Sequence, residues 1–237
     1  MITRVIIPAF NEARSIGLVI SDIPTGLAEE VVVVDNASTD ETERNARAAG
    51  ATVITEKRRG YGYACLAGIA HISARPTDIV AFLDGDYSDH PDEMTSLVRP
   101  IADGDADLVI GSRMLGKRER GAMLPQAVVG NRIACVLMRL IWRARYTDLG
   151  PFRAIRLDCL RELQMTDKTF GWTIEMQIKA AQCGLRVREV PVSYRRRVGV
   201  SKITGTVGGT LRASAKIIWT IGKHAVAYRR KHLSAGG

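Results

Sequence analysis

The chain has 237 residues, 46% of them hydrophobic, so it can bury one sizeable core and sits near the upper size of a single α/β domain. Its four cysteines lack the spacing of a metal site, and no secretory signal precedes the first strand-like segment. Charges interrupt every apolar run before it reaches the roughly 18–20 residues that span a bilayer. We therefore expect a single domain over residues 1–237, located in the cytoplasm and without a membrane span.

The net charge of +9 hides an uneven distribution along the chain. Residues 1–110 carry 9 Lys and Arg against 18 Asp and Glu, whereas residues 111–237 carry 25 against 7. The basic second half indicates contact with phosphates, nucleic acid or an anionic membrane surface. A well-solvated basic surface is the simpler explanation, and the charge by itself is compatible with either.

The first half alternates short apolar runs with helix-like stretches, the pattern that builds a parallel sheet flanked by helices. Val31 to Val34 and Ile79 to Leu83 are apolar without alternation, as in strands covered on both faces. The expected strands are Arg4–Pro8, Glu30–Asp35, Thr52–Glu56, Ile79–Leu83 and Asp107–Gly111. The expected helices are Ala13–Ile23, Thr39–Ala49, Gly62–Ser73 and Asp92–Ala102, the last started by Pro91.

The regular alternation ends after Gly111, where a loop rich in Gly, Lys and Arg occupies residues 116–121. The pattern then predicts, in order, a long helix Gln126–Arg143, an extended segment Phe152–Arg156, a helix Thr173–Cys183, strands Arg186–Val190 and Val192–Arg195, and a basic helix Thr206–Lys231. No internal repeat or low-complexity linker divides the chain. The second half is therefore expected to continue the same sheet.

Two of the expected strands end in an aspartate. Asp35 follows the valine run, and Asp84 follows Ile79–Leu83, with Asp86 placed two residues further on past a glycine. In open α/β sheets the ligand crevice lies at the carboxyl ends of the strands, so these carboxylates would project into it. Two such carboxylates suit Mg²⁺ or Mn²⁺. An ordinary Asp-Gly turn explains the same residues equally well when they are taken alone.

Six ordered segments together resemble family 2 glycosyltransferases of the GT-A fold. They are VIIPAFNEARSI, VVVVDNASTDET, AFLDGDYSDHP, DLVIGSR, DLGPFRAIR and VGVSKITG, and the match extends to about Leu211. The chain looks especially similar to the dolichyl- and polyprenyl-phosphate sugar synthases of that family. The resemblance implies an α/β fold with a mostly parallel central sheet. Residues 1–111 would bind the nucleotide sugar, 112–205 would carry the acceptor side, and 206–237 would form a basic C-terminal helix.

The resemblance also implies roles for individual residues. Asp86 would bind Mg²⁺ or Mn²⁺ directly, Asp84 would lie near the metal or the ribose, and Asp35 would contact the base or ribose. Arg113 would lie near the donor phosphates. The remaining residues of the donor site would be Pro8, Ala9, Asn11 and Glu12 around the nucleoside, and Arg197, Ser201 and Lys202 in a segment that closes over the diphosphate.

Gly60 and Gly62 superficially match a dinucleotide fingerprint, because they follow a strand and open a helix. Cys65 stands where the third glycine belongs, and no first Rossmann strand precedes the segment, so NAD binding is rejected. A similar segment lines the donor side in the resembled family. We therefore expect both glycines at the donor site.

Two departures from the family pattern concern the acceptor. Many lipid-phosphate synthases have an Arg between the GSR segment and the following Asn, where this chain has Gln126. The metal segment ends in Ser88-Asp89, where relatives often have Gln, which leaves an indirect role for Asp89. The first departure weakens the inference of a phosphate acceptor.

A proton acceptor is needed only if the acceptor group is a hydroxyl. Glu175 or Asp148 would then remove the proton, whereas an ionised phosphate needs no base and these residues would orient it. Glu175 also fits a helix first-turn acid that the helix dipole favours. Trp172 is as compatible with the core as with stacking on a sugar.

These observations together predict an inverting, metal-dependent transfer from a UDP- or GDP-sugar to a polyprenyl phosphate or a glycan hydroxyl, at the inner face of an anionic membrane. The alternatives are a sugar-phosphate nucleotidyltransferase, disfavoured because the loop Pro8–Glu12 lacks Lys and Arg, and a nucleic-acid-binding module. The module is disfavoured by 5% aromatic content and an acidic first half, so no nucleic-acid partner is expected. The sequence leaves the oligomeric state open.

Overall fold

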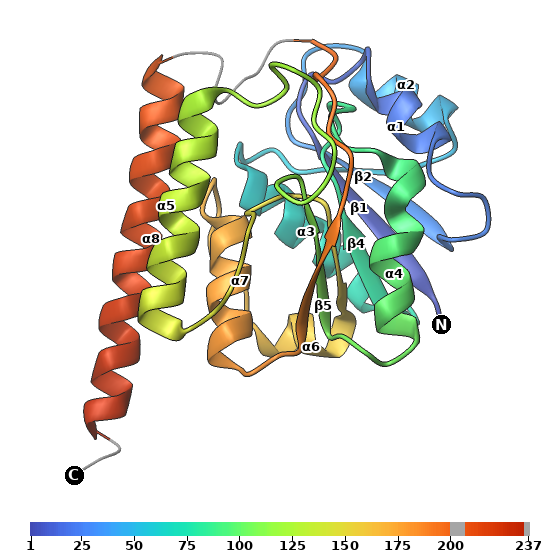
Figure 1. Cartoon of the computed structure of the whole chain (residues 1–237). Coiled ribbons are helices and arrows are strands. Elements are labelled where there is room, and N and C mark those ends of the chain that lie inside the picture. Colours follow the sequence, from blue (N-terminus) through green and yellow to red (C-terminus); the bar gives the residue numbers. More distant parts are fainter. Residues whose placement is uncertain (200–206, 235–237) are drawn as a thin grey trace.

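The computed structural model describes residues 1–199 and 207–234, and within these ranges the strands form one seven-stranded sheet with helices on both faces (Figure 1). The strands are β1 (Thr3–Ala9), β2 (Glu30–Asp35), β3 (Thr52–Thr55), β4 (Ile79–Phe82), β5 (Leu108–Ser112), β6 (Arg153–Arg156) and β7 (Val187–Pro191). Their spatial order is β3-β2-β1-β4-β6-β5-β7. The predicted boundary at residue 111 therefore falls inside β5, and the sheet continues across both halves.

The sheet is mostly parallel, with one antiparallel insertion. β1 pairs in parallel with β2 and β4, β2 with β3, and β5 with β7. β6 lies between β4 and β5 and runs antiparallel to both, with Val80 opposite Ile155 and Leu108 opposite the same residue. Because β1, β2 and β4 run the same way, their carboxyl ends meet at one edge.

The helices cover both faces of the sheet. They are α1 (Ile16–Ser21), α2 (Thr42–Ala48), α3 (Tyr61–Ser73), α4 (Met94–Ala102), α5 (Pro125–Trp142), α6 (Leu157–Glu162), α7 (Trp172–Gln182) and α8 (Val207–Ser234), with a 3₁₀ turn η1 (Pro91–Glu93) before α4. Alternate residues of each strand face opposite sides of the sheet. Ile7 therefore belongs to the core cluster that includes residues of α1, α2 and α4, whereas Ile6 belongs to the cluster that includes residues of α3, α5, α6 and α7.

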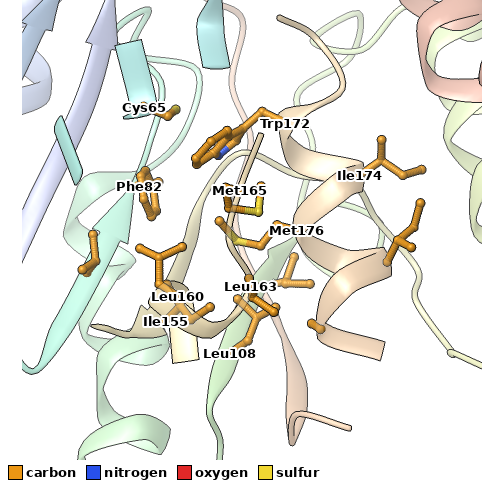
Figure 2. Close-up of a cluster of buried hydrophobic side chains, with 14 of the residues drawn as sticks. Cys65, Phe82, Leu108, Ile155, Leu160, Leu163, Met165, Trp172, Ile174 and Met176 are labelled. Atoms are coloured by element: carbon orange, nitrogen blue, oxygen red, sulfur yellow. The ribbon is translucent and has the colours of Figure 1, made fainter. Parts of the chain in front are cut away.

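The larger core lies under α3 and α7, where Trp172 is fully buried (Figure 2). Its ring centroid lies 6.2 Å from that of Phe82 at a tilted angle, a favourable arrangement for two aromatic rings. Met165 and Met176 lie close by in the same cluster. Trp172 is therefore a core residue, and stacking on a sugar is ruled out by its burial.

The outermost layer consists of α5 and α8, which run side by side (Figure 1). Trp142 at the end of α5 meets Tyr228 of α8 edge to face, with ring centroids 6.4 Å apart. Along residues 1–199 and 207–234, no helix combines the length and the apolar character needed to cross a bilayer.

The predicted strands and long helices are confirmed to within a few residues, with three differences. Val192–Arg195 is not a strand: past Pro191 the chain leaves the sheet, and only Tyr194 makes isolated bridges, to Asp89 and Arg118. The first helix begins at Ile16 instead of Ala13, and the fourth follows the turn η1. The short helix α6 was not expected, because six residues are too few for a clear helical period.

Candidate active site

A cavity of about 320 Å³ opens at the carboxyl ends of β1, β2 and β4. This is the edge at which ligands bind in open α/β sheets. The residues around it are Pro8, Ala9, Phe10, Glu12, Asn36, Arg59, Gly60, Tyr61, Ala64, Asp84, Gly85, Asp86, Thr169, Phe170 and Arg197. Seven of the predicted site residues are among them: Pro8, Ala9, Glu12, Gly60, Asp84, Asp86 and Arg197.

Two carboxylates after β4 form the acidic floor of the cavity. The Oδ1 atom of Asp84 is buried and has no hydrogen-bond partner among the described residues. Burial raises the pKa of Asp84, and the positive charge of Arg197 opposes this shift. Asp86 is 3% exposed, and its Oδ1 accepts hydrogen bonds from the Ser88 backbone N–H at 2.9 Å and the Ser88 hydroxyl at 2.5 Å.

The donor set of this floor fits a hydrated divalent cation. Within residues 1–199 and 207–234, no group of three or more His, Cys, Asp or Glu side chains converges into a complete metal cage. Asp84 instead offers a buried oxygen without a partner, and Asp86 offers a second carboxylate in the same cavity. Mg²⁺ is commonly held by one or two carboxylates, with water and substrate phosphate completing its shell.

Residues 192–198, which follow β7 at the edge of the sheet, form a strap that passes next to Asp86. The Val198 N–H donates to the Asp86 carbonyl at 2.9 Å, and the Arg195 N–H donates to the Ser88 carbonyl at 2.9 Å. These hydrogen bonds hold the strap beside Asp86, and the Arg197 guanidinium forms an ion pair with the Oδ2 atom of Asp86. The predicted residues Ser201 and Lys202 lie outside the described residues.

The loop after β1 is held by the loop after β2. The Asn11 N–H donates to the Ser38 hydroxyl at 2.9 Å, and the Asn11 side-chain oxygen accepts from the Thr39 N–H at 2.8 Å. Asn11 has φ 53°, a left-handed conformation that Asn tolerates. Asp35 is buried at the end of β2 and accepts from the Ser38 N–H at 3.3 Å. Asn11 and Asp35 do not line the cavity, and their hydrogen bonds instead hold the loops after β1 and β2.

Asn36 fixes the opposite loop and was not predicted as a site residue. Its amide donates to the carbonyls of Glu56 and Arg58 at 3.0 and 2.7 Å, and its oxygen accepts from the Gly60 N–H at 2.8 Å. This arrangement places Arg59 at the cavity, with its guanidinium carbon 4.5 Å from the centre of the Phe10 ring. Asn36 thus positions the guanidinium of Arg59 at the cavity.

Gly60 and Gly62 allow another loop to approach the start of α3. A Cβ on Gly60 would lie 2.3 Å from the Lys168 carbonyl oxygen, and one on Gly62 would lie 2.0 Å from that of Asp167. The Tyr63 N–H donates to the same Lys168 carbonyl at 3.1 Å. Gly60 lines the cavity, while Gly62 lies behind it as a packing contact.

Arg113 and Asp148 form a buried pair outside the cavity lining. The Arg113 Nε and Nη2 atoms lie 2.7 and 2.8 Å from the two carboxylate oxygens, and the Arg113 N–H donates to Asp148 as well, at 2.8 Å. Burial lowers the pKa of Arg113, but the adjacent Asp148 charge outweighs burial and raises it overall. Asp148 is completely buried and already holds several donors.

Glu175 lies in the first turn of α7, also away from the cavity lining. Its carboxylate accepts from the Thr166 hydroxyl at 2.6 Å and from the Asp167 N–H at 2.7 Å, and it pairs with Lys179 at 2.9 Å. Burial raises the pKa of Glu175, but these hydrogen bonds and the lysine outweigh burial, and the pKa is lowered overall. The proposed role as general base stays a prediction for both Glu175 and Asp148.

Asp89 is a buried carboxylate three residues after Asp86. Neither of its carboxylate oxygens has a hydrogen-bond partner among the described residues. Burial, reinforced by the nearby charge of Asp84, raises its pKa to about 7. The sequence singled out Asp89 only by its departure from the family pattern.

Sequence reasoning missed Phe10, Asn36, Arg59, Thr169 and Phe170 among the residues that line the cavity, whereas Tyr61 and Ala64 belong to the glycine segment expected on the donor side. Asn36 and Phe10 adjoin predicted positions, so the strand-end rule could have included them. Thr169 and Phe170 carry no local signal, because they reach the cavity from a loop more than 80 residues away from β4 in the chain.

Comparison with known proteins identifies the family of the chain. Residues 4–163 match the model of glycosyl transferase family 2. An uncharacterized glycosyltransferase of Mycobacterium tuberculosis (strain H37Rv) is 37% identical over 211 residues, covering 88% of this chain and 93% of that protein. An undecaprenyl-phosphate mannosyltransferase of Micrococcus luteus is 31% identical over 219 residues, covering 86% and 88%.

A solved structure supports the fold as well. Glucosyl-3-phosphoglycerate synthase from Mycobacterium tuberculosis, in complex with Mn²⁺, UDP and glucosyl-3-phosphoglycerate, superimposes with a TM-score of 0.70 at 25% identity, covering 93% of this chain and 80% of that one. The fold is thus the GT-A fold. The chain belongs to glycosyl transferase family 2 and is a glycosyltransferase.

Proposed function

We propose that this enzyme transfers a sugar from a UDP- or GDP-sugar to a polyprenyl phosphate, with inversion and with Mg²⁺ or Mn²⁺ held by Asp84 and Asp86. The observation that carries the proposal is the strand-end cavity, which is lined by Asp84 and Asp86 together with two arginines, Arg59 and Arg197. The structural relative whose complex contains UDP and Mn²⁺ supports the choice of donor and metal.

The chain's own residues would bind the donor and offset its charge. Pro8, Ala9 and Glu12 border the nucleoside end, and Arg59 and Arg197 lie where the diphosphate would enter. The cation, when bound, supplies Lewis-acid stabilisation of the departing nucleotide diphosphate. Attack on the anomeric carbon from the face opposite the nucleotide inverts the linkage.

The state of the candidate bases favours a phosphate acceptor. Asp148 and Glu175 are both outside the cavity lining, and both carboxylates are occupied by hydrogen bonds and by a cation. An acceptor hydroxyl would need a positioned base, whereas an acceptor phosphate is already ionised. The similarity to an undecaprenyl-phosphate mannosyltransferase points the same way.

The outer face of α5 and α8 fits a lipid-linked acceptor. Four apolar side chains form a stripe along α5: Val129, Ile133, Val136 and Leu140, each 48–73% exposed. Ile218, Trp219 and Val226 continue the apolar surface on α8. Neither helix contains an Asp or Glu. Two exposed arginines, Arg132 and Arg139, lie on α5. An apolar stripe flanked by cations is typical of helices that lie on an anionic bilayer. In this proposal α5 and α8 contact the cytoplasmic face of that bilayer.

A soluble hydroxyl acceptor is the second candidate, because one structural relative is in complex with glucosyl-3-phosphoglycerate, which contains no lipid. The two candidates separate in one assay. Thermal-shift screening of UDP- and GDP-sugars with and without Mn²⁺ would identify the donor, since a ligand that binds the native state raises its apparent stability. Incubation of that donor with undecaprenyl phosphate or with 3-phosphoglycerate then identifies the acceptor. Transfer to the soluble acid alone, or equal transfer with EDTA, would contradict the proposal.

A further inference from the structure

The loop Thr166–Phe170 forms a wall between two cavities. Thr169 lines both the active-site cavity and a second cavity of about 180 Å³, and Phe170 lines the first. The far side of the second cavity is formed by α8, through Lys216, Trp219 and Lys223 among others. The position of this loop therefore sets the shape of one side of the active-site cavity.

Two buried carboxylates hold the loop. Glu175 binds its beginning, at Thr166 and the Asp167 N–H, as described above. Asp167 binds its end: its Oδ1 atom accepts from the Thr169 N–H at 2.8 Å and from the Gly171 N–H at 3.1 Å. The carbonyls of Asp167 and Lys168 meanwhile rest against the start of α3.

The second oxygen of Asp167 connects this wall to α8. Lys216 Nζ lies 2.8 Å from Asp167 Oδ2, and the two side chains are 29% and 7% exposed. Burial raises the pKa of Asp167, but Lys216 and the Thr169 N–H outweigh it and the pKa is lowered overall. Gly171 makes room for this carboxylate, because a Cβ there would lie 2.5 Å from Oδ2.

We infer that Asp167 is a positioning residue for sugar transfer: it holds Thr169 and Phe170 in the wall of the donor cavity and anchors that wall to α8 through Lys216. The inference rests on the proposed donor site, since it assigns a purpose to the wall of that site. Its consequence is that α8, the helix with the apolar outer surface, also maintains the shape of the active site.

Lys223 provides a matched control for Lys216. Both lysines lie on α8, both line the second cavity, and both approach the Trp219 ring, at 4.6 Å for Lys216 and 5.4 Å for Lys223. Within the described residues, only Lys216 forms an ion pair with Asp167. Removing either lysine lowers the positive charge of α8 by one, but only the removal of Lys216 breaks the ion pair with Asp167.

The test compares Lys216→Met, Lys216→Arg and Lys223→Met by two measurements. Hydrogen exchange of the peptide covering residues 166–171 reports on the wall, because the Thr169 and Gly171 amides donate to Asp167. The KM for UDP-glucose and for GDP-mannose, each with Mn²⁺, reports on the donor cavity. Lys216→Met should raise both by about 2–5-fold, the effect of one partly exposed ion pair, with kcat nearly unchanged. Lys223→Met should match the wild type, and Lys216→Arg should restore it.

Two outcomes would overturn the inference. One is equal exchange in Lys216→Met and Lys223→Met; the other is faster exchange in Lys216→Met with an unchanged KM, which would make the pair merely structural. Asp86→Asn separates these from a failure of the proposed function. If Asp86→Asn loses metal-dependent turnover while the two lysine variants are identical, only the positioning role is wrong. If Asp86→Asn behaves as wild type, the donor site itself is misassigned.

Discussion

Asp86 illustrates how a single carboxylate serves both the fold and the proposed chemistry. Asp86→Asn keeps an oxygen that can accept from Ser88, so we expect the fold to persist. Loss of the charge should lower metal-dependent turnover by about 10²-fold or more, because a Lewis-acid cation contributes several kcal/mol. Asp103→Asn, at an exposed position after α4, is the control. Unchanged stimulation by Mn²⁺ in the Asp86 variant would contradict the assignment.

Arg197 occupies the carboxylate that the metal would use. Removing it by Arg197→Ala should tighten Mn²⁺ binding to the nucleotide-free protein by up to about fivefold, since a partly exposed ion pair is worth at most about 1 kcal/mol. The same change should weaken binding of UDP or GDP, which lose a cation. Isothermal titration of Mn²⁺ and of each nucleotide measures both effects.

Arg196→Ala is the matched control for this experiment. Arg196 lies in the same strap, but its guanidinium donates to the Arg120 carbonyl and not to Asp86. If both arginine variants bind Mn²⁺ alike, Arg197 does not compete with the metal.

Glu175 predicts a specific pH dependence of stability. Its folded-state pKa is lowered, so its contribution is present above the unfolded-state value of about 4.3 and is lost as the pH falls through the lower folded-state value. Glu175→Gln should therefore cost about 1–3 kcal/mol at pH 7, and the difference from wild type should shrink below about pH 4. Thermal melts between pH 7 and pH 3 measure this.

Turnover of the same variant distinguishes positioning from general-base catalysis. If Glu175 is the general base, Glu175→Gln should lower the turnover number by about 10²–10⁴-fold, even at temperatures where the variant is folded. A modest change in turnover beside the predicted loss of stability would agree with the hydrogen bonds that the carboxylate makes. A loss of the larger size in a folded protein would identify a hydroxyl acceptor.

At the scale of elements, the contact between α3 and the loop Thr166–Phe170 depends on the absence of side chains. Gly62→Ala creates a steric clash, because the new Cβ would lie 2.0 Å from the backbone carbonyl oxygen of Asp167. We expect a loss of about 1–3 kcal/mol, the usual cost of overpacking, together with a raised KM for the donor.

Gly17→Ala is the control for that substitution. Gly17 lies in α1, and a Cβ there would meet nothing within 4 Å. Alanine in a helix is favoured over glycine by about 0.5–1 kcal/mol, so this variant should be slightly more stable than wild type. Chemical denaturation of both variants gives the comparison, and equal stability of the two would contradict the packing argument.

At the scale of the whole molecule, α5 and α8 pack side by side and present an apolar outer face. Val136→Glu should weaken binding to phosphatidylglycerol vesicles about tenfold, because burying one valine is worth about 1.5 kcal/mol. Leu18→Glu, at a 44% exposed position on the other side of the sheet, should bind as wild type. Cosedimentation at two salt concentrations tests this, and equal loss in both variants would exclude a specific membrane face.

The sequence alone determined the strand-helix alternation and the acidic strand end. The valine run and the apolar run that begins at Ile79 are confirmed as the buried strands β2 and β4, and Asp84 and Asp86 line the cavity as the strand-end rule predicts. These features depend on local periodicity and on the common direction of parallel strands, which a sequence records directly.

Only the tertiary structure decided the partners of the remaining side chains. Glu175 and Asp148 carry no sequence sign that their carboxylates are occupied, because their donors are set by where distant loops pack. The antiparallel placement of β6, the strap that brings Arg197 to Asp86, and the wall held by Asp167 likewise join segments far apart in the chain. Such contacts depend on how packed layers align in space, and local patterns of hydrophobicity do not encode that alignment.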